Sequence, residues 1–380
     1  MDITIKGDEM AAHQSAGPPD ARTDRAPPHR GRRHPTVRWI ANGVLFVALV
    51  AGVFGLLPRL GGLTHDAAGL RHARPAFLAA AIVAQALSLG CYAQLYRQVL
   101  AALGARIRFR LAADVILATF FVSHLTPFGS ATGTLVNAST LESEGIPATT
   151  TGEAIALTSL TSTIALIVLF GTGFAATAGR HVSHQYLIIA GVVIFLVVAA
   201  LAAVLAVGAH PAVAGRAGRW AASVAKHVRP GIDPEKAAET SRRLASLARS
   251  ALTGRAFLRS FGFASGDLLF DLLSLDLVFL ALRYQPGFGP LAVAYGAANI
   301  ASAIPLTPGG LGVIEVTLVA ITVGFGTPRA TAVLAVLGYR IANFWLPLIP
   351  GAIAYIRLRL RPDADGKRKG KEKPAAPQAG

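Results

Sequence analysis

LTPGGLGVIE, residues 306–315, places a proline and a cluster of glycines inside an apolar region of the chain, and LTPFGSATGT, residues 125–134, does the same. Proline removes a backbone donor and glycine admits irregular backbone, so both residues interrupt helices. Within hydrocarbon, irregular backbone persists only where protein or a water-filled cavity covers its polar groups. We therefore expect both stretches to be broken helices that face an interior cavity.

The composition around these stretches is that of a membrane protein. Hydrophobic residues make up 53% of the 380 residues and charged residues only 15%, a balance that is unusual for a soluble domain. Uncharged runs long enough to cross about 30 Å of hydrocarbon, which takes about 20 helical residues, occur at 39–57, 76–96, 154–178 and 185–208. More polar spans are predicted at 111–130, 261–282, 288–305 and 330–356. The predicted fold class is all-α: a polytopic membrane helix bundle of about eight spans plus two broken or re-entrant Pro-Gly segments.

The basic residues occupy the loops and ends rather than the apolar runs. The formal net charge is +16, and Lys and Arg gather in 1–36, 97–110, 208–259 and 357–373. Cytoplasmic segments of membrane proteins carry such an excess, so we expect a plasma (inner) membrane protein with both termini in the cytoplasm. Anionic membrane lipids are the expected partners of these charges, and nucleic acid is not.

The ordered part of the chain is expected to form a single domain. Residues 1–36 predict a disordered basic arm, 37–360 one transmembrane domain, and 361–380 a disordered basic tail. Inside the long basic loop, Asp233 and Pro234 fit an N-cap and a first helical residue, and apolar residues follow at helical spacing. This pattern indicates an amphipathic helix, either at the membrane interface or as a solvated linker.

The two Pro-Gly stretches align without a gap when their first residues are superimposed. The same alignment, continued along the chain, carries Gly145 onto Gly326 and Pro147 onto Pro328. Agreement at residues that dictate backbone shape predicts an internal duplication, with chance similarity in an apolar chain as the alternative. Repeat one would cover about 111–208, a loop 209–255, and repeat two about 256–360.

The basic loops also predict how the repeats are oriented. If 97–110 and 208–259 are both cytoplasmic, an even number of crossings must separate them. The chain offers three clear spans there, and a short or broken crossing at 127–141 supplies the fourth. The repeats are then inverted, entering the membrane in opposite directions, as in transporters whose interrupted helices form the binding site. A segment that dips in and returns to its own side would instead make the repeats parallel.

The broken segments supply most of the candidate binding residues. Half-helices that begin after Pro127 and Pro308 would point free N–H groups at an anionic group such as a phosphate. Close packing of helices through small residues is the alternative explanation of the glycines. The predicted substrate-binding residues are Pro127, Gly129, Pro308, Gly309, Gly310, Gly312, Glu315, Arg340 and Asp276.

Ionisable residues inside predicted spans are the other candidates, because charges at membrane depth need a partner or a cavity. Glu315 and Arg340 are expected to pair or to share a substrate headgroup, with Arg340 taking phosphate; a purely structural salt bridge is an equal alternative. Asp267 and Asp271 lie on one helical face and could hold a divalent cation, relay protons, contact a cationic headgroup or face water. Asp276 lies deeper in the same predicted span.

Metal and nucleotide sites find no support in the sequence. The chain has one cysteine, and its ten histidines show no zinc-binding spacing. No Gly-rich loop is followed by Lys and then Ser or Thr, as a phosphate-binding loop would be. We therefore expect no metal and no cofactor.

With PLTPGGLGVIEVTL at 305–318 and GYRIANFWLPLIPG at 338–351, the chain resembles the flippase-like transmembrane domain of bacterial lysylphosphatidylglycerol synthases, over residues 39–359. In the synthases this domain is associated with moving aminoacylated phospholipid between leaflets, while a separate soluble domain attaches the amino acid. No segment here resembles that soluble domain, so the resemblance implies a stand-alone flippase-like protein and not a lysyltransferase. The first repeat departs from the family, because Ala131, Thr132 and Leu135 stand where a Gly-Glu pair and an Arg are often found.

Together these observations favour a transporter of lipids or lipid-linked headgroups over an enzyme. The substrate partner would be a phospholipid or a lipid-linked group, taken up by a polar cavity in the middle of the membrane. One alternative is a membrane-embedded enzyme that acts on polyprenyl-phosphate or phospholipid, using Asp267, Asp271 and Asp276. Another is a non-catalytic scaffold with a soluble transferase as its partner.

Overall fold

A computed structural model describes residues 73–125, 129–177, 210–226, 233–251, 254–302 and 307–360, and its regular elements are all helical. The predicted terminal segments 1–36 and 361–380, the predicted spans at 39–57 and 185–208, and Pro127 lie outside the described residues. Among the described helices, those at Pro75–Ala102, Ala148–Thr177 and Arg329–Arg359 are long and apolar enough to cross a membrane. The all-α membrane fold class is confirmed.

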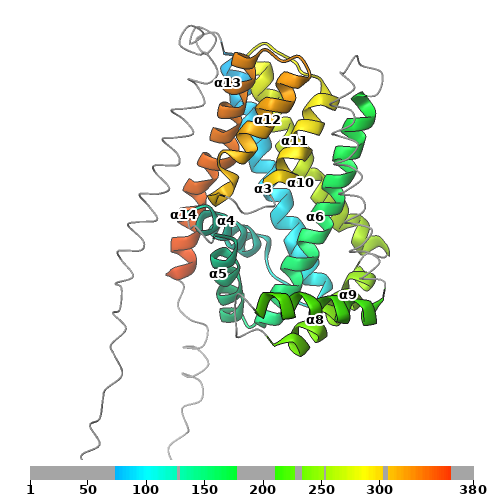
Figure 1. Cartoon of the computed structure of the whole chain (residues 1–380). Helices are drawn as coiled ribbons and strands as arrows, with labels where there is room; N and C mark the ends of the chain where they lie inside the picture. The colour runs from blue at the N-terminus through cyan, green and yellow to red at the C-terminus, as the bar shows by residue number, and fades with distance from the viewer. Residues whose placement is uncertain are drawn as a thin grey trace, which may run out of the picture. The chain divides into compact units, whose positions relative to one another are not determined.

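Two groups of helices follow one another along the chain (Figure 1). The first group contains α3 (Pro75–Ala102), α4 (Phe109–Leu125), α5 (Gly129–Ser143) and α6 (Ala148–Thr177). The second group contains α10 (Gly254–Ala281), α11 (Phe288–Ser302), the 3-10 turn η1 (Pro308–Gly310), α12 (Val313–Gly324), α13 (Arg329–Arg340), the π-helical turn η2 (Ile341–Trp345) and α14 (Leu346–Arg359). Between the groups lie α8 (Pro211–Lys226) and α9 (Pro234–Ala251).

The long helices α3 and α10 form the centre of the bundle and run in opposite directions. The N–H of Arg74, just before α3, donates to the carbonyl of Ala281, the last residue of α10, at 3.0 Å. Halfway along, Gly266 lies so close to Cys91 that an added Cβ would be 3.2 Å from its Sγ. Equivalent elements of the two groups are therefore antiparallel.

The turns of the second group repeat those of the first. After α3, the N–H of Ala105 donates to the carbonyl of Leu100, and after α10 the N–H of Tyr284 donates in the same way to Phe279. The alignment predicted from the Pro-Gly stretches carries the end of α5 onto the end of α12, the start of α6 onto the start of α13, and the left-handed Gly145 (φ 84°) onto Gly326 (φ 94°). The described helices thus occur twice, in inverted orientation, while the predicted domain boundaries stay a prediction.

Both Pro-Gly stretches lie at the tips of helical hairpins. An added Cβ at Gly133 of α5 would lie 3.0 Å from the carbonyl oxygen of Thr119, so α5 returns along α4. The hydroxyl of Tyr284, before α11, donates to the carbonyl of Gly326, after α12, at 3.4 Å, so that hairpin also enters and leaves at one end.

The predicted spans at 111–130 and 288–305 are therefore wrong as single crossings. The first predicted span is divided between α4 and α5, and the described part of the second is α11, which has Ser302 as its last described residue. The hairpin helices α5 and α11 have 15 residues and α12 has 12, fewer than the about 20 that a crossing takes. Each hairpin enters and leaves the bundle at the same end, so it does not change the direction of the long helix that follows. The two groups of helices are therefore still inverted relative to one another.

The last helix of each group, α6 in the first and α14 in the second, packs against a helix of the other group. α6 packs antiparallel to α11, where an added Cβ on Gly296 would lie 2.5 Å from the ring of Phe170. α14 packs antiparallel to α4, where an added Cβ on Gly351 would lie 2.7 Å from the carbonyl oxygen of Leu117. These two contacts correspond, so an approximate two-fold axis relates the groups.

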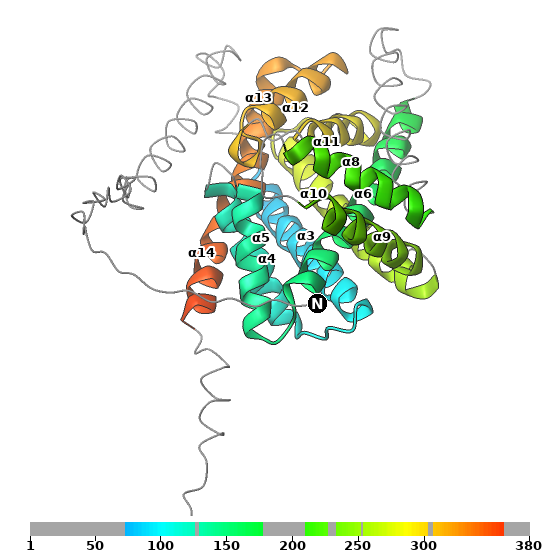
Figure 2. The same ribbon diagram turned by 60° about the horizontal axis from the view of Figure 1, so that its bottom comes forward.

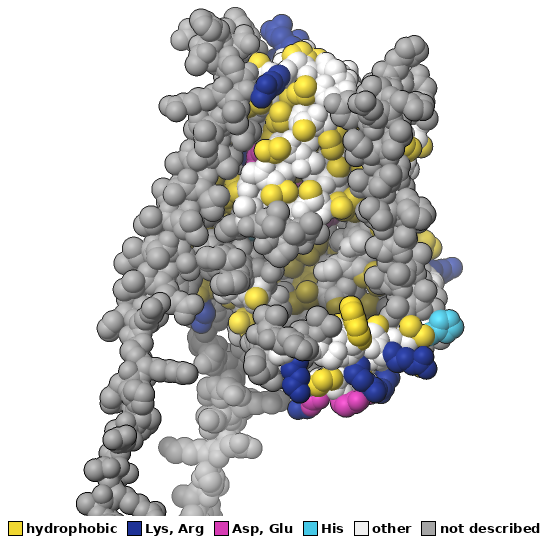
Figure 3. Space-filling model, in the orientation of Figure 1, with side chains coloured by type: hydrophobic (Ala, Val, Ile, Leu, Met, Phe, Trp, Pro, Cys, Tyr) yellow, Lys and Arg dark blue, Asp and Glu magenta, His cyan; other side chains and the backbone are white. Residues whose placement is uncertain are grey.

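The basic loop folds into α8 and α9, which lie side by side across one end of the bundle (Figure 2). α9 begins at the predicted Pro234, and Asp233 caps it by accepting a hydrogen bond from the N–H of Glu235 at 3.0 Å. Arg243 of α9 pairs with the buried Glu153 of α6 at 2.6 Å, which ties the helices to the bundle. Lys and Arg side chains gather over this end of the molecule (Figure 3). The predicted helix is confirmed, and its contact with lipid stays a prediction.

We expect Gly309→Ala to destabilise the protein by about 1–3 kcal/mol. Gly309 has φ 63°, and an added Cβ would lie 2.5 Å from the Phe344 ring and 2.7 Å from that of His124. Thermal unfolding in detergent should show a melting temperature several degrees below that of the wild type. Gly171→Ala is the matched control, because that helical glycine has open space around it. Equal melting temperatures for the two variants would show that the break at Gly309 does not require glycine.

Candidate functional site

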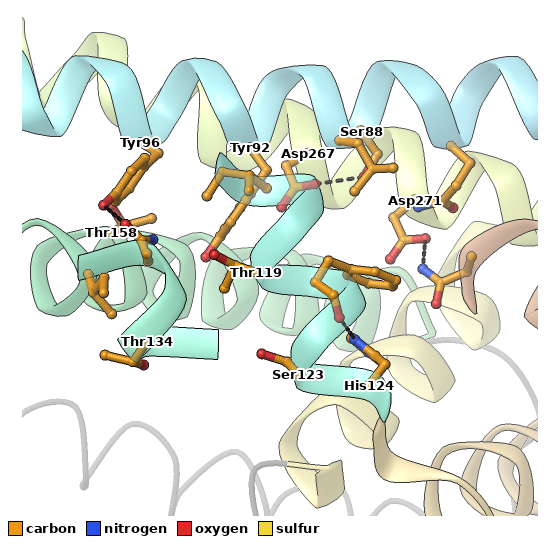
Figure 4. Close-up of a pocket in the computed structure, with 17 residues that line it drawn as sticks. Ser88, Tyr92, Tyr96, Thr119, Ser123, His124, Thr134, Thr158, Asp267 and Asp271 are labelled. Carbon is orange, nitrogen blue, oxygen red and sulfur yellow. Dashed lines mark hydrogen bonds between the residues drawn. The ribbon is translucent and has the colours of Figure 1, made fainter. Parts of the chain in front are cut away.

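A cavity of about 340 Å³ opens between the first hairpin and the central helix pair (Figure 4). Its walls come from both groups of helices and are rich in polar and aromatic side chains. It is lined by Gln85, Ser88, Leu89, Tyr92 and Tyr96 of α3; Ile116, Thr119, Phe120, Ser123 and His124 of α4; Thr134 and Asn137 of α5; Ile155 and Thr158 of α6; Asp267 and Asp271 of α10; and Asn343 of η2. The cavity is therefore shared between the two groups.

Asp271 is the more tightly held of the two acids in the cavity wall. The hydroxyl of Tyr295 donates to its Oδ2 at 2.7 Å. The hydroxyl of Tyr339 and the amide of Asn343 donate to its Oδ1 at 2.9 and 2.8 Å. Three neutral donors from three elements thus fix the carboxylate in place.

Asp267, one turn away, has much less support. Its Oδ1 accepts a hydrogen bond from the hydroxyl of Ser88 at 2.6 Å, and no other residue in the described part of the chain donates to it. The two residues are 179 positions apart, which is also the separation between the last residues of α3 and α10. Ser88 and Asp267 are therefore equivalent residues of the two groups. A residue that contacts its own counterpart lies on the axis that relates them.

Several buried polar atoms around the cavity have no hydrogen-bond partner. They are Gln85 Oε1, Thr119 Oγ1 and Thr158 Oγ1, and none of them finds one within the described ranges. The side chains of Gln85 and Thr158 are only 4% and 1% exposed. Buried polar groups are nearly always paired in folded proteins. The cavity thus offers hydrogen-bonding capacity to an occupant.

The charge of the cavity wall is negative. Asp267 and Asp271 are its acids, and none of the described residues that line it is Lys or Arg. His124 donates from Nδ1 to the carbonyl of Phe120 at 2.7 Å and stacks on the Phe120 ring. An occupant with positive charge or several donors suits such a wall better than an anion.

Glu315 and Arg340 form a buried ion pair away from the cavity. Arg340 Nε donates to Glu315 Oε1 at 2.5 Å, and the side chains of Arg340 and Glu315 are 3% and 1% exposed. Arg340 also donates to the carbonyl of Gly309 at 3.1 Å, and Glu315 Oε2 accepts from the N–H of Gly312 at 2.6 Å. The pair therefore holds the irregular backbone of the second break, although neither residue lines the cavity.

The other predicted binding residues lie in or near the breaks. Gly129 is the first residue of α5, and Pro308 the first of η1. Gly310 and Gly312 have φ values of 67° and 87°, which the break requires. Asp276 lies further along α10, half-buried and outside the cavity lining. Substrate binding by these residues stays a prediction.

The cavity residues of α3 were missed because their span was treated as uniformly apolar. Gln85, Ser88, Tyr92 and Tyr96 recur every three or four residues, so they share one helical face. The opposite face exposes large apolar side chains, among them Val83. A search for polar residues at helical spacing inside the span could have found this stripe.

The two groups differ most where the cavity lies. The alignment that superimposes the Pro-Gly stretches relates Thr134 to Glu315 and Thr158 to Tyr339. The second group fills its half of the arrangement with a buried acid and a buried tyrosine, whereas the first group has threonines that line the cavity. The cavity is thus the space that small side chains leave open in one half of a two-fold arrangement.

We expect Glu315→Gln and Arg340→Gln each to destabilise the protein by about 3–5 kcal/mol, because each leaves a buried charge without its partner. The double variant should be less unstable than the sum of the single changes, because it leaves neither charge. Melting temperatures of all three proteins in detergent measure this coupling. Arg219→Gln, which breaks an exposed ion pair, is the control and should change little. Additive losses would contradict the pairing.

The comparisons with known proteins agree with this architecture. Residues 40–351 match the family described as the lysylphosphatidylglycerol synthase transmembrane region. A UPF0104 membrane protein of Methanothermobacter thermautotrophicus is 34% identical over 85 residues, which are 22% of this chain and 25% of that protein. One of Methanocaldococcus jannaschii is 29% identical over 103 residues, 27% of this chain and 30% of that protein. The alignments thus span less than a third of these relatives. Because the family match covers most of its length, the chain belongs to the lysylphosphatidylglycerol synthase transmembrane region family.

Proposed function

We propose that this membrane protein moves lipids or lipid-linked headgroups between leaflets, using the cavity as its binding site. The observation that carries the proposal is the Ser88–Asp267 hydrogen bond, which joins equivalent positions of two inverted groups inside a polar cavity. In transporters built from inverted repeats, substrate sites lie near the middle of the membrane where the repeats meet. A site on the axis stays assembled while either side opens.

The hairpins suggest how access alternates. The hairpin of α4 and α5 and the hairpin of α11, η1 and α12 enter the bundle from opposite ends, and their tips meet where His124 lies against Gly309. Movement of one hairpin would open the cavity toward one leaflet, and movement of its counterpart toward the other. The hairpins then act as two gates around a fixed site.

The charges favour a headgroup that carries an amine. Asp267 and Asp271 supply two acids without a Lys or Arg in the described lining. At the second break, the N–H of Gly310 donates to the carbonyl of Thr307 and the N–H of Gly312 donates to Glu315, so neither is free for a phosphate. A lipid whose phosphate stays near the interface while its ammonium enters the cavity fits both observations.

We expect wild-type protein in proteoliposomes to exchange acyl-labelled aminoacylated phosphatidylglycerol between leaflets faster than acyl-labelled phosphatidylglycerol. Asp267→Asn should lower the initial rate at least about tenfold, since losing one ionic contact of about 1.4 kcal/mol suffices. Chemical quenching of the outer-leaflet label follows the exchange. Glu142→Gln, which removes an exposed acid of α5, is the control. No exchange of either lipid by folded protein would contradict the proposal.

Thr158→Tyr should block exchange by filling the cavity in the way that Tyr339 fills the second group. Thr158 lines the cavity, so the larger ring occupies space that the substrate needs. We expect a loss of at least about tenfold in rate, with a melting temperature close to that of the wild type because a cavity receives the ring. Thr163→Tyr adds the same ring to an exposed position of α6 and should leave the rate unchanged. Equal lipid exchange rates for the two variants would show that the lipid does not pass through the cavity.

A further inference from the structure

None of the described residues that line the cavity beside its two acids is Lys or Arg. The guanidinium of Arg340, outside the lining, is already engaged by Glu315 and by the carbonyl of Gly309. An unpaired carboxylate inside a membrane protein is costly, so something must neutralise it when no substrate is bound. Water can always supply a proton to a carboxylate, whereas a metal cation would need further ligands.

The two acids are not equivalent candidates for that proton. Both oxygens of Asp271 already accept hydrogen bonds from neutral donors, and these donors stabilise the carboxylate. Asp267 accepts one hydrogen bond, at Oδ1, and no described residue donates to its Oδ2. The less supported acid, which lies on the axis, is therefore the one to be neutralised.

The groups around Asp267 supply no positive charge of their own. The titratable groups near Asp267 are Cys91 and Tyr92 of α3, Asp271 of α10, Tyr295 of α11 and Tyr339 of α13, and Tyr96 and His124 line the same cavity. Arg340, which is paired with Glu315, lies near Asp271. The thiol and the phenols are neutral in their ordinary forms. The remaining cavity walls, from α5 and α6, contribute only Thr134, Asn137, Ile155 and Thr158, none of which titrates.

We infer that Asp267 holds a proton while the cavity is empty and releases it when an ammonium group binds, so that the protein exchanges a proton for each cationic headgroup. The inference rests on the proposed function for the identity of the bound group. The O–H bond of the acid breaks, the proton passes to cavity water, and the carboxylate pairs with the ammonium. One positive charge replaces another, so the net charge inside the membrane does not change.

The unpaired oxygens explain how an ammonium could compete with a proton. An ammonium has three N–H donors, and Asp267 can accept one of them. Gln85 Oε1 lines the same cavity, belongs to the turn of α3 before Ser88 and lacks a partner in the described structure. It can accept a second N–H, which a proton on Asp267 cannot use. A pH difference across the membrane would then drive movement of the lipid.

The first test detects the proton on the wild-type protein. Dicyclohexylcarbodiimide, which modifies protonated carboxyl groups in apolar surroundings, is added to purified full-length protein in detergent, and peptides are examined by mass spectrometry. We expect modification of Asp267 and not of Asp271. Short-chain lysyl-phosphatidylglycerol at about ten times its Kd should lower the modification about tenfold, and phosphatidylglycerol should not. Unmodified Asp267, or modification that the lysyl lipid leaves unchanged, would overturn the inference.

The second test counts protons released on binding. In weakly buffered solution with a pH indicator, wild-type protein should release about one proton for each lysyl-phosphatidylglycerol bound, and Asp267→Asn none. Glu153→Gln, which changes a buried acid outside the cavity, should release as many as the wild type. Lipid binding without proton release would leave the proposed transporter standing and overturn the exchange. Absence of binding by folded wild-type protein would overturn both.

Discussion

Every backbone polar group inside hydrocarbon needs a partner, and the rest of this structure depends on how that constraint is met at the helix breaks. At the second break the solution is the ion pair of Glu315 and Arg340. Glu315 accepts a hydrogen bond from the N–H of Gly312, and Arg340 donates one to the carbonyl of Gly309. This pair of side chains thus provides partners for backbone groups that have no partner within a helix. Glu315 and Arg340, which the sequence suggested as a headgroup site, therefore have a structural role in stabilising the backbone of the second break.

Meeting the constraint differently in the two halves is what creates a cavity. The second half fills its interior with Glu315, Arg340 and Tyr339, all buried. The first half places Thr134 and Thr158 at two of the equivalent positions and leaves space beside its hairpin. A strictly symmetric protein would either be packed in both halves or hollow in both. The difference between the halves at these two positions therefore coincides with the cavity.

Much of the fold was predictable because the local signals are strong. Apolar runs predicted the long helices, and the spacing of Pro and Gly predicted the alignment that relates α5 with α12 and α6 with α13. The hairpins were predicted as broken or re-entrant segments, with a crossing preferred, because hydropathy cannot tell a short span from half of a hairpin. The site was harder still. The polar face of α3 indicates a site only when α10 is known to pack against α3. No local sequence pattern shows that these two helices pack together.

The position of Asp267 links the symmetry to the chemistry. If the halves rock about their common axis, distances far from the axis change most and a contact on the axis changes least. The Ser88–Asp267 bond can then persist in both orientations, whereas His124 and Thr119 on α4 move with the hairpin. Asp271 is held from three elements of the second half alone, namely α11, α13 and η2, so it belongs to one moving part. An acid at the contact between the two halves is accessible from each leaflet in turn. Asp267, which accepts fewer hydrogen bonds than Asp271, is therefore the acid that exchanges its proton for a cation.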